Sequence, residues 1–207
     1  MRLLPILCVA LCLTNCASRQ VMVSVADQRM VVLDGNQVEK VYPISTSKFG
    51  LGDRHGSKCT PLGRLTIAKK IGRNAPSGAV FKSRRRTGEV LQPNAPGRDP
   101  IVTRILWLKG TEARNRNAYR RYIYIHGTPE EWRIGQRASY GCIRMRSKDV
   151  IDLYKRVRVG TDVTIVRDSV LSGNHLARRQ QRSFARKERL VAHQLRAPRQ
   201  GLFGLWN

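Results

Sequence analysis

The chain has 207 residues, 41% of them hydrophobic, which suits one domain with a real core plus appendages. Its 39 Lys and Arg against 14 Asp and Glu give a formal net charge of +25. This charge says nothing about the fold. It favours an anionic partner such as nucleic acid, acidic polymer or anionic lipid, and the alternative is a well-solvated basic surface without a specific partner. Basic composition alone is only weak support for nucleic-acid binding.

The N-terminus resembles a bacterial export signal. A basic start is followed by an apolar run over residues 3–13, which is too short to span a bilayer as a helix. The Leu-Thr-Asn-Cys sequence ending at Cys16 resembles a lipoprotein cleavage box, although Asn15 replaces the usual small residue. We therefore predict a signal peptide over residues 1–16 and export to the periplasm or cell envelope. The chain is then either lipid-anchored at Cys16 or cleaved as an ordinary signal.

Five cysteines are present, and three of them lie within the predicted signal. Cys59 and Cys142 remain in the part of the chain that is expected to fold. In an oxidising compartment these two could form a disulfide. Alternatively, one of them is a free thiol that an exported protein would retain only for a purpose.

The first part of the folded chain is typical of a β-meander. Three strands are predicted by apolar or alternating runs at residues 21–25, 30–33 and 38–44. The pair Asp34-Gly35 is a favourable hairpin turn between the second and third strands. A loop over residues 45–61 and a short strand at 65–68 complete this region.

The central region predicts long loops around two strands. Residues 71–100 contain glycines, prolines and three consecutive arginines, which indicates a long loop of the kind that is usually functional. Residues 101–108 are strongly apolar and predict a buried strand, whereas 112–121 are polar and predict a loop or a short helix. The run 122–125 predicts a strand with Tyr122, Tyr124 and His126 on one face.

A helix and a final strand are predicted near the end of the domain. Residues 147–157 show an apolar stripe at helical spacing, with Ser147 as the expected N-cap. A turn at Gly160-Thr161 leads into a last strand at 163–166. We therefore predict a domain over residues 17–167.

A basic appendage is predicted over residues 168–207. It holds eight Lys and Arg against two acidic residues. One interpretation is an electrostatic tether to anionic envelope polymer or lipid, and the other is a solvated tail without a partner.

His126 and Cys142 are the candidate catalytic pair. A cysteine attacks a carbonyl as its thiolate, and a nearby imidazole can take the proton. A histidine at a strand end can meet a cysteine in a loop, where Gly141 would let backbone N–H groups face an oxyanion. The alternative is a buried hydrophobic cysteine beside a structural histidine.

The sequence around this pair resembles the signature of L,D-transpeptidases with the YkuD-type catalytic domain. The matching residues are His126-Gly127-Thr128 and Ser139-Tyr140-Gly141-Cys142-Ile143-Arg144-Met145. Residues 44–48, 60–63 and 160–165 resemble further segments of that domain in the right order. The resemblance covers about residues 20–167.

The resemblance implies a mostly β, β-sandwich-like fold with a few short helices, and an exported enzyme that acts on peptidoglycan stem peptides. Cys142 would attack the carbonyl of the third stem residue, release the terminal D-alanine and pass the acyl group to an amine of a second stem. His126 would be the base, oriented by the carbonyl of Gly127. The N–H groups of Gly141 and Cys142 would form the oxyanion hole.

Further residues of the motifs are candidates for substrate binding. Tyr140 stands where many members of the family carry a second histidine, and it could hydrogen-bond substrate or simply pack. Arg144 could hold a substrate carboxylate or be a surface cation. Ser139 and Thr128 complete this set. The remaining histidines, His55, His175 and His193, lack partners at ligand spacing, so we predict no metal and no cofactor.

Three alternatives stay open at this point. Water in place of the amine would make the chain an L,D-carboxypeptidase, and the acceptor could also be a protein that becomes attached to the wall. A non-catalytic protein that binds the envelope is favoured only by Tyr140. Nucleic-acid binding is opposed by the export signal, so no nucleic-acid partner is expected.

Overall fold

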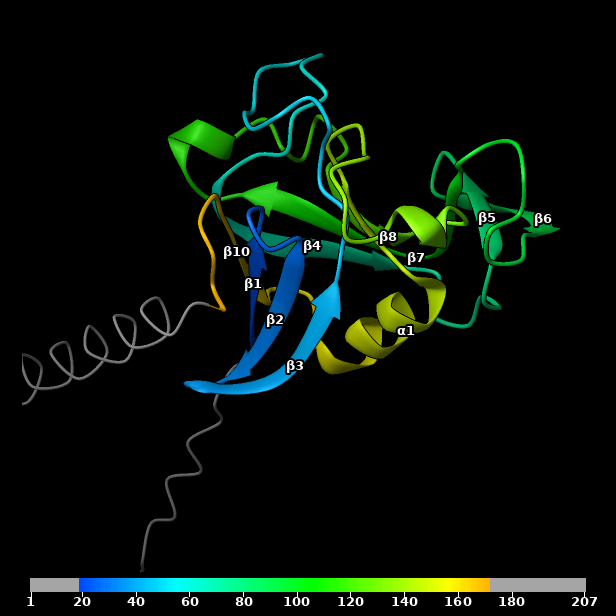
Figure 1. Cartoon of the computed structure of the whole chain (residues 1–207), viewed down its shortest axis with the longest axis horizontal. Helices are drawn as coiled ribbons and strands as arrows, with labels where there is room; N and C mark the ends of the chain where they lie inside the picture. Colours follow the sequence, from blue (N-terminus) through cyan, green and yellow to red (C-terminus); the bar gives the residue numbers. More distant parts are fainter. Residues whose placement is uncertain (1–18, 172–207) are drawn as a thin grey trace, which may run out of the picture.

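The computed structural model describes residues 19–171, whose strands form one mixed sheet (Figure 1). The ten strands are β1 (Gln20–Ser24), β2 (Arg29–Asp34), β3 (Gln37–Pro43), β4 (Gly63–Ile71), β5 (Ala79–Lys82), β6 (Arg85–Val90), β7 (Ile101–Gly110), β8 (Tyr124–Gly127), β9 (Ile143–Met145) and β10 (Asp162–Val166). The helices are α1 (Ser147–Arg156) and two single turns, η1 (Ala113–Asn115) and η2 (Glu131–Arg133). The predicted mostly β fold with a few short helices is confirmed. The predicted signal peptide lies outside the described residues.

Strand β7 is the branching point of the sheet. The sheet order is β3-β2-β1-β10-β4-β7-β5-β6, and β7 also pairs with β8, which in turn pairs with β9. The pairs β1–β10 and β8–β9 are parallel, and the other pairs are antiparallel. The first and last strands of the domain are therefore neighbours near the middle of the sheet.

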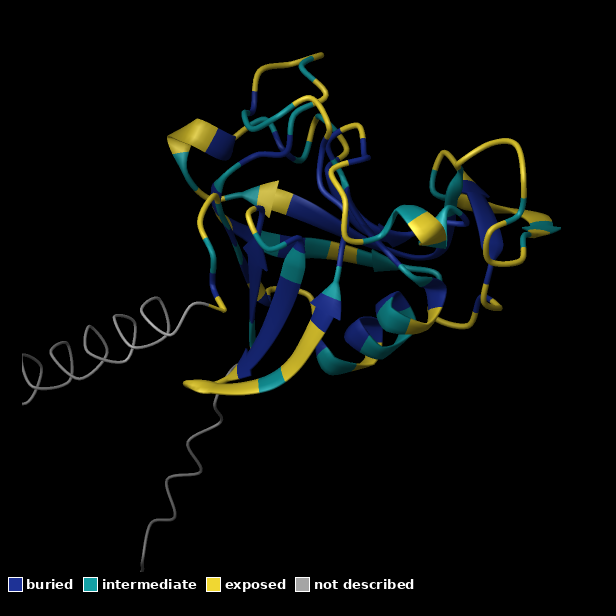
Figure 2. Ribbon diagram, in the orientation of Figure 1, coloured by how far each residue is buried: buried dark blue, intermediate teal, exposed yellow. Residues whose placement is uncertain are grey.

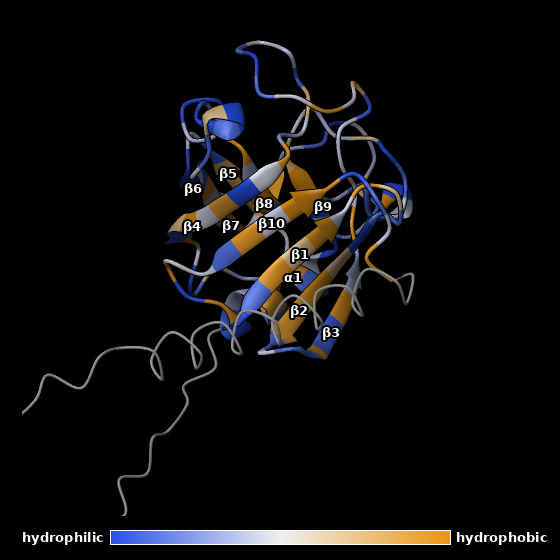
Figure 3. Ribbon diagram, turned by 90° about the vertical axis from the view of Figure 1, so that its left-hand side faces the viewer, coloured by the Kyte–Doolittle hydropathy of each residue, from blue (hydrophilic) through white to orange (hydrophobic). Residues whose placement is uncertain are grey.

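The main core lies between the curled sheet and α1 (Figure 2). Strands β1, β2, β4, β7, β8, β9 and β10 all contribute fully buried side chains to it. Helix α1 adds Val150, Leu153, Tyr154 and Val157, the last just past its end. Figure 3 shows hydrophobic colouring along β1, β2 and β10. Each such aliphatic side chain, once buried, contributes about 1.5–3 kcal/mol, so the helix is held by packing on this core.

The start of α1 differs from the prediction. Ser147 is the first helical residue, and Arg146 occupies the N-cap position without a side-chain cap. The Glu131 carboxylate accepts the Ser147 N–H at 2.8 Å, and the Ser147 hydroxyl lies 2.8 Å from the hydroxyl of Thr103. A tertiary contact thus takes the place of the local cap, which is a form of capping that the local sequence does not reveal.

A hairpin occupies the middle of the predicted loop 71–100. Strands β5 and β6 are joined by Ser83 and Arg84, both with positive φ, and project at the right of Figure 1. The β6 sequence RRTGEV is largely exposed. It therefore lacks the apolar alternation that predicts a strand.

The packed chain continues beyond residue 167. The Asp27 carboxylate accepts the Val170 N–H at 2.9 Å and the Ser169 hydroxyl at 3.0 Å. Val170 is fully buried in a small cluster with Met22 of β1 and two residues of β2. The other predicted tail residues, 172–207, lie outside the described residues. Within residues 19–171, no helix is long and apolar enough to cross a membrane.

These contacts give a prediction for truncated chains. A chain ending at Arg167 should be about 2–4 kcal/mol less stable than one ending at Leu171, because it lacks Val170 and the hydrogen bonds to Asp27. Urea unfolding of the two truncated chains measures the difference. Equal stability of the two would mean that residues 168–171 add nothing to the fold.

Candidate active site

The loop that carries Cys142 is held by two distant segments of the chain. The N–H and C=O of Ser45 pair with those of Arg144 at 2.9 and 2.8 Å, and the Thr46 carbonyl accepts the N–H of Ser139. The Thr60 hydroxyl donates to the carbonyl of Gly141 at 3.0 Å. The segments 44–48 and 60–63, which carried part of the family resemblance, thus hold the loop that precedes Cys142.

Two glycines of the motifs are required by their surroundings. Gly141 has φ +119°, and a Cβ there would lie 3.2 Å from the carbonyl oxygen of Cys59. A Cβ on Gly127 would lie 2.7 Å from the carbonyl oxygen of Val102 in β7. The first glycine lets the loop turn before Cys142, and the second lets β8 approach β7 closely.

His126 lies within β8 and is buried, with 5% of its surface exposed. Its Nδ1 is 2.8 Å from the carbonyl oxygen of Gly127, so this nitrogen carries the proton when the ring is neutral. Burial lowers the pKa of His126, while the Gly127 carbonyl and Asp99 act in the opposite direction. The imidazole is therefore neutral at neutral pH, with Nε2 free of a proton and able to accept one.

The Cys142 thiol is partly enclosed by backbone groups. Its sulfur lies 3.4 Å from both the carbonyl oxygen of Tyr122 and the nitrogen of Tyr124. Burial raises the pKa of Cys142 to about 11, because the thiolate is less well solvated than in water. For this sulfur to act as a nucleophile, a base must take its proton.

This pKa predicts how Cys142 reacts with an alkylating reagent. At pH 8 a thiol with a pKa of about 11 is ionised in about one molecule in a thousand. The alkylation rate of Cys142 should therefore still rise about tenfold per pH unit between pH 8 and pH 10. Mass analysis of a Cys59→Ala chain treated with iodoacetamide measures this rate. A rate that levels off below pH 8 would indicate a thiolate–imidazolium pair instead.

Cys142 lies between two hollows of the surface. One, of about 150 Å³, is lined by Asp99, Ile101, His126, Ser139, Tyr140, Cys142 and Arg144. The other, of about 270 Å³, is lined by His55, Gly56, Lys58, Arg120, Arg121, Tyr122, Ile123, Tyr140 and Cys142. The sulfur can thus be approached from the side of the imidazole and from a basic side.

Arg144 belongs to a buried ion-pair network beside His126. Its Nη1 donates to Asp99 and, at 3.1 Å, to Glu130, while the Thr128 hydroxyl also donates to Asp99. Among the described residues, Nε and Nη2 of Arg144 have no hydrogen-bond partner. Arg144 lines the smaller hollow, whereas Thr128 is fully buried and does not line either one.

Ser139 and Gly141 bond to each other within the loop. The Ser139 hydroxyl donates to the carbonyl of Cys142 at 2.5 Å and accepts the Gly141 N–H at 3.2 Å. An oxyanion at Gly141 would have to share or displace this last bond. Ser139 therefore shapes the loop as well as lining the hollow.

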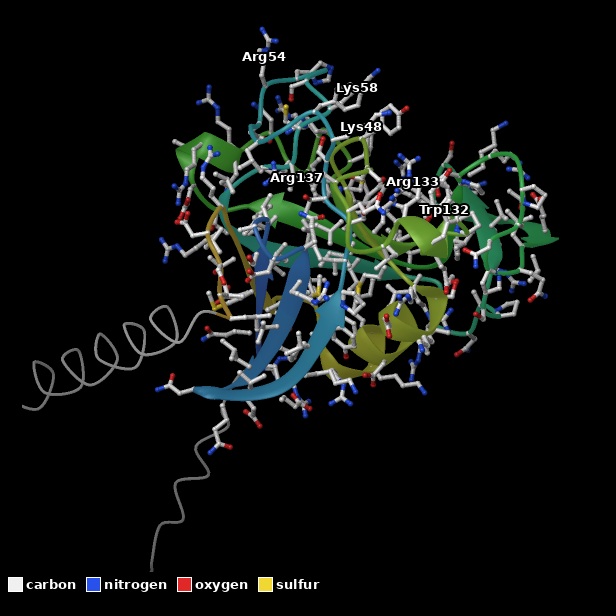
Figure 4. All side chains as sticks on the ribbon, in the orientation of Figure 1. Lys48, Arg54, Lys58, Trp132, Arg133 and Arg137 are labelled. Atoms are coloured by element: carbon white, nitrogen blue, oxygen red, sulfur yellow. The ribbon has the colours of Figure 1, made fainter. Side chains whose placement is uncertain are left out.

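Tyr140 stands at the rim of the site with 59% of its surface exposed. Lys48 donates to its hydroxyl at 3.3 Å, and its ring lies against Phe49 with centroids 5.3 Å apart. The ammonium of Lys58 lies 5.5 Å from the ring centre. Figure 4 shows Lys48 and Lys58 together on the upper loops, so the rim is both aromatic and basic.

The exposed position of Tyr140 predicts a mild effect for Tyr140→Phe. The ring and its contacts stay, and only the exposed bond to Lys48 is lost. The rate of acylation by a carbapenem should fall by less than about tenfold, since a hydrogen bond to an exposed group contributes little. Intact-protein mass at fixed times measures the rate. Complete loss would assign essential chemistry to the hydroxyl.

Several residues around the site were not predicted from the sequence. Asp99 lies near the end of the predicted loop 71–100, and Arg121 and Lys58 lie in segments that carry no motif. Cys59 and Cys142 are both free thiols. No group of three or more His, Cys, Asp or Glu within residues 19–171 is placed to hold a metal ion.

Comparison with known proteins finds similarities to one family, to curated proteins and to solved structures. A family model of the L,D-transpeptidase catalytic domain, YkuD, matches residues 18–165. The Bacillus subtilis protein "Putative L,D-transpeptidase YqjB" is 29% identical over 154 residues, which cover 72% of each chain. The Escherichia coli protein "Probable L,D-transpeptidase YcfS" is 29% identical over 150 residues. The match covers 70% of this chain but only 43% of YcfS. Among solved structures, an L,D-transpeptidase from Mycobacterium smegmatis is 15% identical with a TM-score of 0.46. That match covers 72% of this chain and 59% of the solved one.

Proposed function

Because the chain belongs to the YkuD family of L,D-transpeptidase catalytic domains, we propose that it is a cysteine-dependent L,D-transpeptidase acting on peptidoglycan stem peptides. The family consists of enzymes that act on peptidoglycan. For this chain, the activity and the substrate are what we propose. The observation that carries it is that Cys142 and His126 line one hollow, with the imidazole held through its Nδ1 by the Gly127 carbonyl.

The first half-reaction forms a thioester. His126 takes the thiol proton on Nε2 as the Cys142 sulfur attacks the carbonyl of the third stem residue. The carbon–nitrogen bond to the terminal D-alanine breaks, and the departing amine receives the proton from the imidazolium. Backbone N–H groups at Gly141 and Cys142 would stabilise the oxyanion, the former by giving up its bond to Ser139.

The second half-reaction regenerates the thiol. A side-chain amine of a second stem attacks the thioester and loses a proton to His126, and the sulfur leaves with that proton. The product is a cross-link, or a protein attached to the wall if the amine belongs to a protein. Water in place of the amine gives an L,D-carboxypeptidase by the same acyl-enzyme.

The remaining motif residues would contact the substrate. Arg144 lines the smaller hollow and would attract a stem carboxylate by its charge, while its Nε and Nη2, which are unpartnered within the described residues, are enclosed by protein. Tyr140 would pack against substrate at the rim. Ser139 would act from the wall of the hollow, and Thr128 only indirectly, through Asp99.

Mass analysis of muropeptides incubated with the purified protein tests the proposal. A transpeptidase gives cross-linked dimers together with free D-alanine, whereas a carboxypeptidase gives shortened monomers. Absence of both products, with intact protein recovered, would leave a binding role and contradict the proposal.

The family works on the cell wall, which places this chain in the cell envelope as part of the same proposal. Export by the segment 1–16 and lipidation of Cys16 remain predictions. So does contact of the basic residues 168–207 with anionic polymer or lipid. Fractionation of the wild type and a Cys16→Ala chain distinguishes a lipid anchor from an ordinary cleaved signal. With a lipid anchor, the wild type would be found in the membrane fraction and the Cys16→Ala chain would not. With an ordinary signal, the two chains would fractionate alike.

A further inference from the structure

A third hollow of the domain is lined largely by cations and lies away from Cys142. It has a volume of about 580 Å³ and is lined by Lys70, Arg73, Asn74, Arg104, Ile151, Tyr154 and Lys155. None of these residues lines the hollows at Cys142. They come from β4, the turn after it, β7 and α1. Figure 1 shows α1 below the sheet, whereas Lys48 and Lys58 lie on the upper loops in Figure 4.

Within residues 19–171, the positive charge of this hollow is not neutralised by ion pairs. Among the described residues 19–171, no ion pair involves Lys70, Arg73, Arg104 or Lys155. Other arginines of the domain, such as Arg156 on the same helix, do pair with carboxylates. The four cations therefore share one concave site without a counter-charge.

Arg104 is the buried member of the set, with 7% of its surface exposed. Its Nη1 donates to the carbonyl oxygens of Ala75 at 2.7 Å and Thr103 at 2.6 Å, which fixes the guanidinium without neutralising it. Within the described part of the chain, Nε has no hydrogen-bond partner. Because Nε is enclosed by protein atoms, a ligand in the hollow would meet the guanidinium at Nη2, which makes no hydrogen bond within residues 19–171, as a charge-assisted contact.

Lys70 places a second fixed charge beside Arg104. Its Nζ donates to the carbonyl oxygens of Tyr154 at 2.7 Å and Val157 at 2.5 Å, at the end of α1. Burial and the nearby charge of Arg73 lower the pKa of Lys70. Burial also lowers the pKa of Arg104. A bound anion would therefore stabilise the charged forms of both Lys70 and Arg104.

The number of cations indicates the class of anion. A carboxylate carries one negative charge, whereas a phosphate monoester carries about −1.5 to −2 and offers three acceptor oxygens. Arg73 and Lys155 are exposed and can reach a ligand that Arg104 holds from below. The hollow also has room for more than one phosphate group.

We propose that the hollow between β4, β7 and α1 binds a phosphate-bearing ligand, held by Arg104 at its base and by Arg73 and Lys155 at its rim. The site is separate from the acyl-transfer chemistry at Cys142. Such a ligand is either a soluble phosphate compound or the headgroup of an anionic lipid, and both share the same contacts.

Calorimetric titration of the full chain with inorganic diphosphate tests the proposal, with glutarate as a dicarboxylate control. Diphosphate should bind more tightly than glutarate. The double substitution Arg73→Gln with Lys155→Gln should weaken diphosphate binding by about tenfold or more, because two charged contacts are lost. Both residues are exposed and have no side-chain hydrogen bond in the described chain, so the fold should be kept.

Two matched variants make the result decisive. Arg54→Gln removes one exposed charge at the upper tip in Figure 4 and should change the affinity by less than about twofold, since exposed distant charges are screened. Arg104→Gln should weaken binding at least as much as the double variant, and its melting temperature shows whether the fold survives. Equal losses from Arg54→Gln and the double variant would assign the binding to general surface charge and overturn the proposal.

A vesicle experiment distinguishes the two sources of phosphate. Vesicles of phosphatidylglycerol should sediment the full chain, and diphosphate should release it, if the ligand is a lipid headgroup. Sedimentation that is the same for the wild type and the double variant identifies a soluble phosphate compound instead. Loss of muropeptide activity in Cys142→Ala would leave all of these binding results unchanged.

Discussion

Replacing Cys142 by alanine should abolish formation of a covalent adduct with a carbapenem, and His126→Ala should slow it by a factor on the order of 10³ or more. The thiol has a pKa of about 11, so few molecules carry a thiolate at neutral pH without a base. The imidazole is buried and neutral, with Nδ1 committed to the Gly127 carbonyl. In the proposed mechanism thiol and base act as one unit, so either loss should remove nearly the whole rate.

The second free thiol provides the matched control. Cys59→Ala removes a partly buried sulfur whose recorded contacts are backbone carbonyl oxygens, those of Phe49 and Ser57. It should acylate at close to the wild-type rate, and intact-protein mass follows all three variants. An adduct on Cys142→Ala would show that another residue is the nucleophile.

Asp53→Ala should destabilise the domain by about 3–5 kcal/mol, because it leaves a buried arginine without its counter-charge. Asp53 and Arg121 form an ion pair at 2.9 Å, and their side chains are 6% and 5% exposed. Asp53 also accepts the Asn117 N–H at 2.6 Å, and Arg121 donates to the Cys59 carbonyl at 2.6 Å. Urea unfolding followed by circular dichroism measures the loss.

An exposed ion pair sets the scale for this result. Arg64 lies 3.1 Å from Glu112 with 74% of its side chain exposed. Arg64→Gln should therefore change the stability by no more than about 1 kcal/mol. If Asp53→Ala lowers the free energy of unfolding by as little as Arg64→Gln does, the buried pair does not hold the loop around Cys59 against the segment before Tyr122.

Local patterns predicted the parts of the fold whose signal is local. Strands β1, β2, β4, β7 and β10 are apolar or alternating, and the helix shows its stripe, so all were located within a few residues. The β5–β6 hairpin was missed because β6 faces solvent and its turn is formed by Ser83 and Arg84, not by glycine. The cap of α1 was missed because Glu131 lies sixteen residues before Ser147.

The candidate site was predicted only as far as its motifs extend. His126, Cys142 and Gly141 stand in contiguous patterns, whereas Asp99 and Arg121 reach the site through folding. The bonds of Asp99 to Arg144 and Thr128 join residues that are 45 and 29 positions apart. Such contacts depend on the sheet topology, which spacing along the chain does not give.

The parallel pairing of β8 with β9 has a consequence for inactivation by heat. Ile125 pairs with Ile143 and His126 with Arg144, so the strand holding the base and the strand that begins directly after the thiol share one ladder. Both strands belong to the main core through fully buried isoleucines. Their opening therefore requires the cooperative loss of that core and not local fraying. The proposed activity and the global structure should therefore disappear over the same temperature range.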